Sequence, residues 1–326
     1  MKATLILLKC RPTPAQVADR LAAPAPEGLE LYLAAEDIQG ADWLARTVDL
    51  LASWPRPAGF ALVVEGPLRS LDGAYFDLTR DTEANREVVS RVAALGRALG
   101  AAAANVHAIA PVGSAEGLGG DRRAEALRAA LPLLRHYARA CEGAGLRPLL
   151  ENIPPVARMR EGAYVYTPIG MAPDDLLWLA AEVPGVGFTL DLSHAQLFLN
   201  ALATPAEAAP AELRPLLRSL QGVFAAGSPS FGPPNQASRG LGGYVDALAP
   251  GLVNVHVSNA SGLLGEGLPY GDGDADLDSA VARALGVADY LVTETLETDP
   301  DRAGLMREAQ ARLLAIRDRA AGRIAS

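Results

Sequence analysis

The sequence predicts a (β/α)8 barrel, in which eight parallel strands alternate with helices around a closed ring. Eight short apolar runs of strand length alternate with longer segments whose leucines and alanines recur every three or four residues. The length of 326 residues is enough for one such barrel. An open doubly wound sheet is the alternative, but no Gly-x-Gly-x-x-Gly follows the first strand.

The predicted elements follow one another in regular order, and we expect them to form a single domain over residues 1–326. The strands are expected at Ala3–Leu8, Leu29–Leu33, Phe60–Val64, Ala103–His107, Arg147–Glu151, Val186–Leu190, Leu252–Val257 and Tyr290–Thr293. The helices are expected at Asp42–Ser53, Glu83–Leu99, Arg122–Glu142, Pro173–Glu182, Ala211–Phe224, Asp276–Leu285 and Asp301–Ala320. A proline is well suited to the first turn of a helix, which supports a start at Pro173.

The connection between the sixth and seventh strands is much longer than the other connections. It covers about residues 199–251, and its part from 226 to 243 is rich in glycine, proline and serine. Connections this long are usually functional or disordered. Because a loop that follows a barrel strand leaves from the rim where active sites form, we expect an active-site lid or a subunit contact. Phe231 and Arg239 are the residues in it best suited to touch a substrate.

The composition excludes several classes of function. A net charge of −9 and a pI near 5.1 argue against a broad basic face for nucleic acid or for an anionic membrane. No apolar run approaches the roughly 18 residues of a membrane span, and we expect a cytoplasmic protein. The two cysteines, Cys10 and Cys141, are expected to be free and buried. Lysine occurs only at positions 2 and 9, which excludes a Schiff-base lysine on a middle or late strand.

Side chains that can bind a metal stand at or near the ends of four consecutive predicted strands. They are Glu151, Asp191, His256 and Glu294. Taken singly, each carboxylate could cap a helix and the histidine could be a core residue. Taken together, they should converge, because the carboxyl ends of neighbouring barrel strands meet at one rim. Three carboxylates and one imidazole predict a single divalent ion, Mn²⁺, Mg²⁺ or Co²⁺, with Zn²⁺ also open.

This set of side chains suggests a reaction. A divalent ion at such a site polarises a carbonyl group and stabilises an enediolate. Glu151 and Glu294, placed on either side of a sugar carbon, would then remove a proton and return it. His194 follows Asp191 by three residues and brings a second imidazole to the same rim.

The pattern of these residues around the barrel resembles the xylose isomerase-like TIM barrel superfamily, over about residues 3–320. That group holds sugar isomerases, ketose 3-epimerases, hydroxypyruvate isomerase-like enzymes, inosose dehydratases and apurinic endonucleases. Three further motifs agree with it. They are Val64-Glu-Gly-Pro67, Asn105-Val-His107 and Leu268-Pro-Tyr-Gly-Asp-Gly-Asp274, the last similar to the family's LPxGxGxxD turn.

The resemblance implies roles for individual residues. Glu151, Asp191, His256 and Glu294 would bind one metal ion, and in the epimerase branch the two glutamates would also be the acid/base pair. His194 would contact a substrate hydroxyl or carbonyl oxygen, and His107 would line the pocket. We expect Lys9, Glu65 and Asn259 to contact the substrate as well.

The departures from the family pattern narrow the choice of branch. The endonuclease branch carries a histidine where this chain has Glu65, and an Asp-x-His pair where it has Gly265-Glu-Gly267. The ketose 3-epimerases usually place an arginine shortly after the seventh-strand histidine, where this chain has Ser258-Asn-Ala-Ser-Gly262.

We therefore expect a metal-dependent isomerase or epimerase of a sugar or sugar derivative. The alternatives are a keto-polyol lyase or dehydratase, a non-catalytic metabolite-binding or trafficking barrel, and, least favoured, a phosphodiester nuclease. The sequence leaves the oligomeric state open, a homo-oligomer included.

Overall fold

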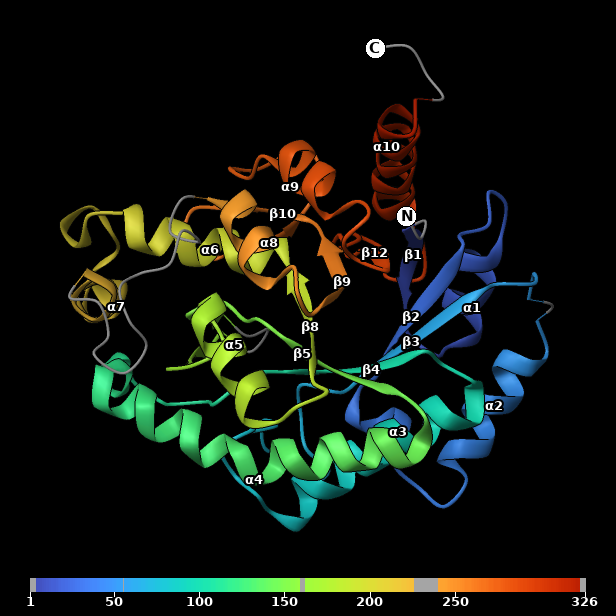
Figure 1. Ribbon diagram of the computed structural model, residues 1–326, viewed down its shortest axis with the longest axis horizontal. Coiled ribbons are helices and arrows are strands. Elements are labelled where there is room, and N and C mark those ends of the chain that lie inside the picture. Colours follow the sequence, from blue (N-terminus) through green and yellow to red (C-terminus); the bar gives the residue numbers. More distant parts are fainter. Residues whose placement is uncertain (1–3, 55, 159–161, 226–239, 323–326) are drawn as a thin grey trace.

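The computed structural model describes residues 4–54, 56–158, 162–225 and 240–322. Within them, eight parallel strands close into a barrel with helices on its outside, which confirms the predicted fold (Figure 1). Around the ring, the strands follow the order β1-β12-β9-β8-β5-β4-β3-β2. Each strand therefore lies beside its predecessor and its successor among the barrel strands, and β12 closes the ring against β1.

The barrel strands lie close to their predicted positions. They are β1 Leu5–Cys10, β2 Gly28–Tyr32, β3 Ala61–Glu65, β4 Ala103–His107, β5 Arg147–Glu151, β8 Gly187–Asp191, β9 Leu252–Val257 and β12 Tyr290–Thr293. The helices are α1 Pro14–Leu21, α2 Trp43–Ala52, α3 Glu83–Leu99, α4 Gly120–Ala144, α5 Pro173–Glu182, α6 Leu192–Ala203, α7 Arg214–Ala225, α8 Leu241–Leu248, α9 Leu277–Ala284 and α10 Gly304–Ala320. Two antiparallel hairpins stand outside the barrel, β6 Val156–Arg158 with β7 Tyr164–Tyr166, and β10 Asn259–Ser261 with β11 Gly265–Leu268.

Three helices and both hairpins go beyond the sequence prediction. Helix α6 has apolar residues around most of its surface and is largely buried, so it lacks the one-sided pattern that marks an exposed helix. Helices α1 and α8 have only eight residues each. Helix α8 also has two glycines in its first turn, which lowers its intrinsic helix propensity. The hairpins have strands of three or four residues, too short for an alternating pattern to stand out.

The described part of the connection between β8 and β9 is mainly helical, with α6, α7 and α8. Phe231 and Arg239 fall among residues 226–239, outside the described residues, and the lid expected there stays a prediction. Cys10 and Cys141 are free and buried, as expected. In the described part of the chain, no helix combines the length and the apolar composition that crossing a bilayer requires.

The inside of the barrel is filled by an apolar layer and, nearer the carboxyl ends of the strands, by polar side chains. The apolar layer is formed by Leu7, Val63, Ala103, Leu149, Val253, Tyr290 and Val292. The polar side chains include Glu30, Asn105, Thr189 and Asn254, each with no exposed surface. Buried polar groups are costly unless they are paired, so this end of the barrel is a polar floor built for a purpose other than packing.

Helix α4 holds two of the strands that supply this floor. The buried hydroxyl of Tyr137 donates a hydrogen bond to the Ala104 carbonyl oxygen at 2.5 Å and accepts one from the Leu149 amide at 3.3 Å. One side chain on the outside of the barrel thereby ties β4 to β5, next to the strand end that carries Glu151.

We expect Tyr137→Phe to lower the free energy of unfolding by about 1–2 kcal/mol, because it leaves two buried backbone groups without this partner. Urea unfolding followed by circular dichroism measures the change. Tyr164→Phe, in the half-buried β7 strand, is the matched control, with an expected change within about 0.5 kcal/mol. Equal losses in the two variants would contradict the role given to the Tyr137 hydroxyl.

Candidate metal and substrate site

The four predicted metal ligands converge at one rim of the barrel. Each offers one ligand atom, and these atoms all lie within 4.8 Å of one another. The four side chains come from the ends of β5, β8, β9 and β12, which are neighbours in the ring. Glu151, Asp191 and His256 are buried, and the side chain of Glu294 is 27% exposed. One ion placed among them could therefore be reached by a ligand from the side of Glu294.

His256 has a different partner at each ring nitrogen. Its Nε2 lies 3.0 Å from both carboxylate oxygens of Glu30, a residue of β2 with no exposed surface. Because a carboxylate only accepts, Nε2 carries the hydrogen and donates it. The lone pair of the neutral ring is then at Nδ1, which lies 3.2 Å from Glu151 Oε1 and 2.6 Å from Glu294 Oε2. A carboxylate behind a histidine is the usual support of a metal-binding imidazole.

The donor atoms at the centre suit a cation. Within the described residues, Glu151 Oε1, Glu294 Oε2 and His256 Nδ1 are buried and have no hydrogen-bond partner. The last two approach to 2.6 Å without the geometry of a hydrogen bond. With the His256 ring neutral these lone pairs repel one another, and either a proton on Nδ1 or a cation among the three atoms removes that repulsion. The residues present therefore fit a divalent ion with mainly oxygen ligands.

The pKa values of the site show how much negative charge is gathered there. Burial alone would lower the pKa of His256, but the carboxylates of Glu294 and Glu30 outweigh it and raise that pKa well above the usual value. Burial raises the pKa of Asp191 from the usual 3.8 to about 6, with Glu294 and Glu151 adding to the rise. Without an ion, protons take up part of the charge that a metal would otherwise balance.

Lys9 supplies the fixed positive charge of the site. Its ammonium group pairs with Glu294 Oε1 and, at 2.6 Å, with Glu65 Oε2. Burial opposes the charge on Lys9, but the carboxylates of Glu294 and Glu65 outweigh it and raise its pKa well above the usual value. Lys9 is thus held in the floor of the site by two carboxylates, and both residues predicted to contact the substrate from this side, Lys9 and Glu65, are buried.

Asn152 holds the Asp191 end of the site in place. Its side chain accepts a hydrogen bond from the Asp191 amide at 2.7 Å and donates one to the Asp191 carbonyl oxygen at 3.0 Å. Its own carbonyl oxygen lies 2.8 Å from Nδ1 of His194, which therefore donates. Asp191 in turn caps α6, because its Oδ1 accepts from the His194 amide at 2.7 Å. The sequence Asp-x-x-His is thus both a cap and a pair of site groups.

The two remaining residues predicted to contact the substrate are His107 and Asn259, and only His107 lies among the metal-site carboxylates. His107 Nε2 lies 3.6 Å from Glu65 Oε1 and 3.7 Å from Glu151 Oε2, so it belongs to the same cluster. Asn259 is buried, and its side chain bonds to backbone groups of Tyr270 and Ala275, which holds the loop after β11. The structure thus gives Asn259 an anchoring contact, and its contact with substrate stays a prediction.

Two residues of the site were missed in the sequence. Glu30 lies on β2, where its neighbours are apolar and a lone acidic residue suggested no ligand. Glu266 lies on β11, and its Oε2 is 3.8 Å from Nε2 of His194. In the sequence, Glu266 stands out only as part of a departure from the nuclease pattern. Glu30 could have been found from its place within an apolar strand, because a buried carboxylate without a partner is costly and its presence there indicates a partner.

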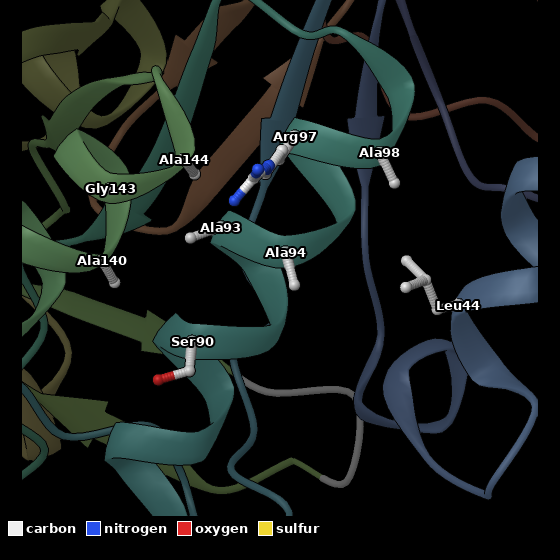
Figure 2. Close-up of a pocket in the computed structure, with 9 residues that line it drawn as sticks. All are labelled: Leu44, Ser90, Ala93, Ala94, Arg97, Ala98, Ala140, Gly143 and Ala144. Carbon is white, nitrogen blue, oxygen red and sulfur yellow. The ribbon is translucent and has the colours of Figure 1, made fainter.

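A surface groove elsewhere offers no comparable chemistry. It lies between α2, α3 and α4, and the close-up shows mostly small side chains around it (Figure 2). Its lining is Leu44, Ser90, Ala93, Ala94, Arg97, Ala98, Ala140, Gly143 and Ala144. None of these is a carboxylate, an imidazole or a thiol, so the groove is no candidate for the metal site.

Comparisons with known proteins agree with this architecture. The family model described as xylose isomerase-like TIM barrel matches residues 25–316. A comparison with curated proteins finds no match. Among solved structures, a D-tagatose 3-epimerase-like protein has 17% identity and a TM-score of 0.62, with 98% of this chain and 99% of that chain covered.

Two more solved structures show the same extent of similarity. A D-allulose 3-epimerase from Methylomonas sp. has 17% identity and a TM-score of 0.60, with 96% of this chain and 99% of that chain covered. A protein from Thermus thermophilus, from a crystal soaked with ZnCl2, has 18% identity and a TM-score of 0.59, with 98% of this chain and 99% of that chain covered. At these identities the likeness shows a shared fold.

We expect Asp191→Asn to leave the metal-free protein at least as stable as the wild type at pH 7.5, because it removes one charge from a crowded site and keeps the helix cap. The folded-state pKa of Asp191 is raised, so its contribution to stability is complete below about pH 4 and is lost as the pH rises through about 6. The advantage of the variant should therefore be absent at pH 4 and reach up to about 3 kcal/mol at pH 7.5.

This difference is measured by thermal unfolding at pH 4 and at pH 7.5. The protein is first treated with a chelator and then transferred into metal-free buffer. A variant that melts clearly below the wild type at pH 7.5 would mean that the Asp191 carboxylate is needed for folding.

We expect Glu30→Leu to weaken Mn²⁺ binding about 10–100-fold, because His256 loses the group that orients its ring. Glu30→Gln should weaken it less, since the amide oxygen still accepts from Nε2. Isothermal titration with Mn²⁺ measures both, with exposed Glu142→Gln as control. Unchanged affinity in a folded Glu30→Leu variant would show that Glu30 has no part in holding the ligand.

Proposed function

The chain belongs to the xylose isomerase-like TIM barrel family, and we propose that it is a divalent-metal-dependent isomerase or epimerase of a sugar or sugar derivative. The observation that carries the proposal is the convergence of three carboxylates and one imidazole, with buried lone pairs that have no other partner among the described residues. Glu151, Asp191, His256 and Glu294 would hold the ion. When bound, a divalent ion at this place polarises a substrate carbonyl group and favours loss of a proton from the neighbouring carbon.

The proton transfer is assigned to two of the same carboxylates. Glu151 and Glu294 come from β5 and β12, the two ends of the four-strand arc. We assign them to different sides of the bound substrate. One, as a carboxylate, accepts the proton next to the carbonyl group, and the other, which carries a proton at that stage, gives it to the enediolate. Protonation on the opposite face of the same carbon inverts that carbon. Protonation at the former carbonyl carbon, with a proton passing between the two oxygens, moves the carbonyl group.

The residues around Glu294 set its protonation state. Burial would raise the pKa of Glu294, but His256 and Lys9 outweigh it and lower that pKa to about 2. Lys9 therefore keeps Glu294 ionised and ready to accept a proton. His194, fixed by Asn152, faces the same space with Nε2 and is suited to contact a substrate oxygen.

The fold neighbours support a sugar as the substrate. Several similar structures are of proteins named as ketose 3-epimerases, among them an L-ribulose 3-epimerase with 15% identity and a TM-score of 0.61. The arrangement of one ion and two flanking carboxylates also serves a dehydratase, since loss of a hydroxide follows the same first proton removal. Identification of the products therefore has to distinguish isomerisation or epimerisation from dehydration.

We expect Mn²⁺, Mg²⁺ or Co²⁺ to support turnover of at least one member of a panel of ketoses and keto-polyols. In D2O, NMR should show deuterium entering at a carbon next to the carbonyl group, with epimer, isomer or dehydrated product identified in the same spectra. Glu151→Gln and Glu294→Gln should each lower turnover at least about 100-fold, while Glu142→Gln should not change it. Turnover that survives in both site variants, or no deuterium exchange with any panel member, would overturn the proposal.

A further inference from the structure

The hairpin of β10 and β11 is a rigid wall beside the metal site. The Gly267 amide donates a hydrogen bond to Ser193 Oγ at 3.2 Å, which ties the hairpin to the first turn of α6. The Gly267 carbonyl oxygen accepts from the Leu296 amide at 2.8 Å, which ties it to the chain just after Glu294. Gly267 has φ +68°, and an added Cβ would lie 2.5 Å from a Leu296 side-chain carbon, so only glycine fits here. Glu266 is therefore presented from a fixed backbone.

Glu266 and His194 face each other across a short gap between their side chains. Glu266 Oε2 lies 3.8 Å from His194 Nε2, which is too long for a hydrogen bond, and one ligand oxygen beside the pair could lie within hydrogen-bond distance of both atoms. The ring of His194 is oriented by the Asn152 carbonyl oxygen at Nδ1, so Nε2 stays directed to the gap. The Glu266 side chain is 40% exposed and that of His194 is 16% exposed, so the gap opens to the outside.

Charge decides which ligand group suits this gap. A carboxylate accepts hydrogen bonds and donates none, so Glu266 needs a donor on the ligand. The surrounding side chains are mostly acidic, with six carboxylates against one lysine, Lys9. These carboxylates belong to Glu30, Glu65, Glu151, Asp191, Glu266 and Glu294. A phosphate or carboxylate group in the gap would meet the like charge of Glu266 at close range and would be repelled by it.

We infer that Glu266 is a specificity-determining residue that selects a free hydroxyl group on the substrate and rejects phosphorylated or acidic sugars. The substrate class is thus an uncharged ketose or keto-polyol. A hydroxyl in the gap donates its hydrogen to Glu266. This inference rests on the proposed function, because it concerns the substrate of the same site.

The test uses the full chain with Mn²⁺ and paired probes, namely D-fructose, D-allulose and L-ribulose and the monophosphate ester of each at its terminal hydroxyl. For each pair, kcat/KM and the affinity from calorimetry are measured for the wild type, Glu266→Gln and Glu266→Arg. The wild type should prefer the free sugar. Glu266→Gln should lower this preference about tenfold, and Glu266→Arg should lower it further or reverse it.

Two controls separate this role from a general effect of charge or folding. Glu308→Arg makes the same change of charge at an exposed position of α10 and should leave the preference unchanged. Mn²⁺ affinity of both Glu266 variants should stay within about threefold of the wild type, since Glu266 is not among the clustered ligands. If free sugars are turned over and the preference is the same in all variants, the inference is wrong and the proposed function stands. If no sugar of the panel binds or reacts with the wild type, the proposed function fails as well.

Discussion

The buried imidazole of His256 is the point on which the rest of the site depends. One of its nitrogens donates to Glu30, and the other faces the carboxylates at the ends of β5, β8 and β12. Carboxylates this close together in a low-dielectric interior repel strongly unless cations lie between them. Lys9 balances part of that charge, and the remainder is what makes the centre suited to a divalent ion.

Closure of the barrel creates this concentration of charge. In the ring, β12 lies beside β9 and β9 beside β8, so residues far apart in the chain become direct neighbours, as in the pairing of Asp191 with His256. Contacts behind the ligands then limit their movement. Asn152 holds both the backbone of Asp191 and the ring of His194, and Asn254 donates to Glu30 at 2.8 Å. Such supporting contacts are what hold ligand atoms in position before an ion binds.

The barrel and its loops divide the chemistry between them. Strand ends carry the metal ligands and the proposed acid/base pair, where backbone hydrogen bonding makes positions precise. The hairpin of β10 and β11 carries Glu266 and lies outside the barrel sheet. This division explains how one fold serves several related reactions, with the metal centre kept and the wall beside it altered.

The sequence by itself determined the order of the strands and helices and the four candidate ligand residues, because the spacing of apolar residues and the position of a side chain at a strand end can be seen in a short stretch of sequence. It showed Glu151 and His256 at strand ends, and closing eight strands in order was enough to bring them together. The tertiary structure alone decided the roles of Glu30, Lys9 and Glu266. Each acts through a partner more than 70 residues away in the chain, and a single charged side chain in a strand or hairpin carries no mark of which distant group it will meet.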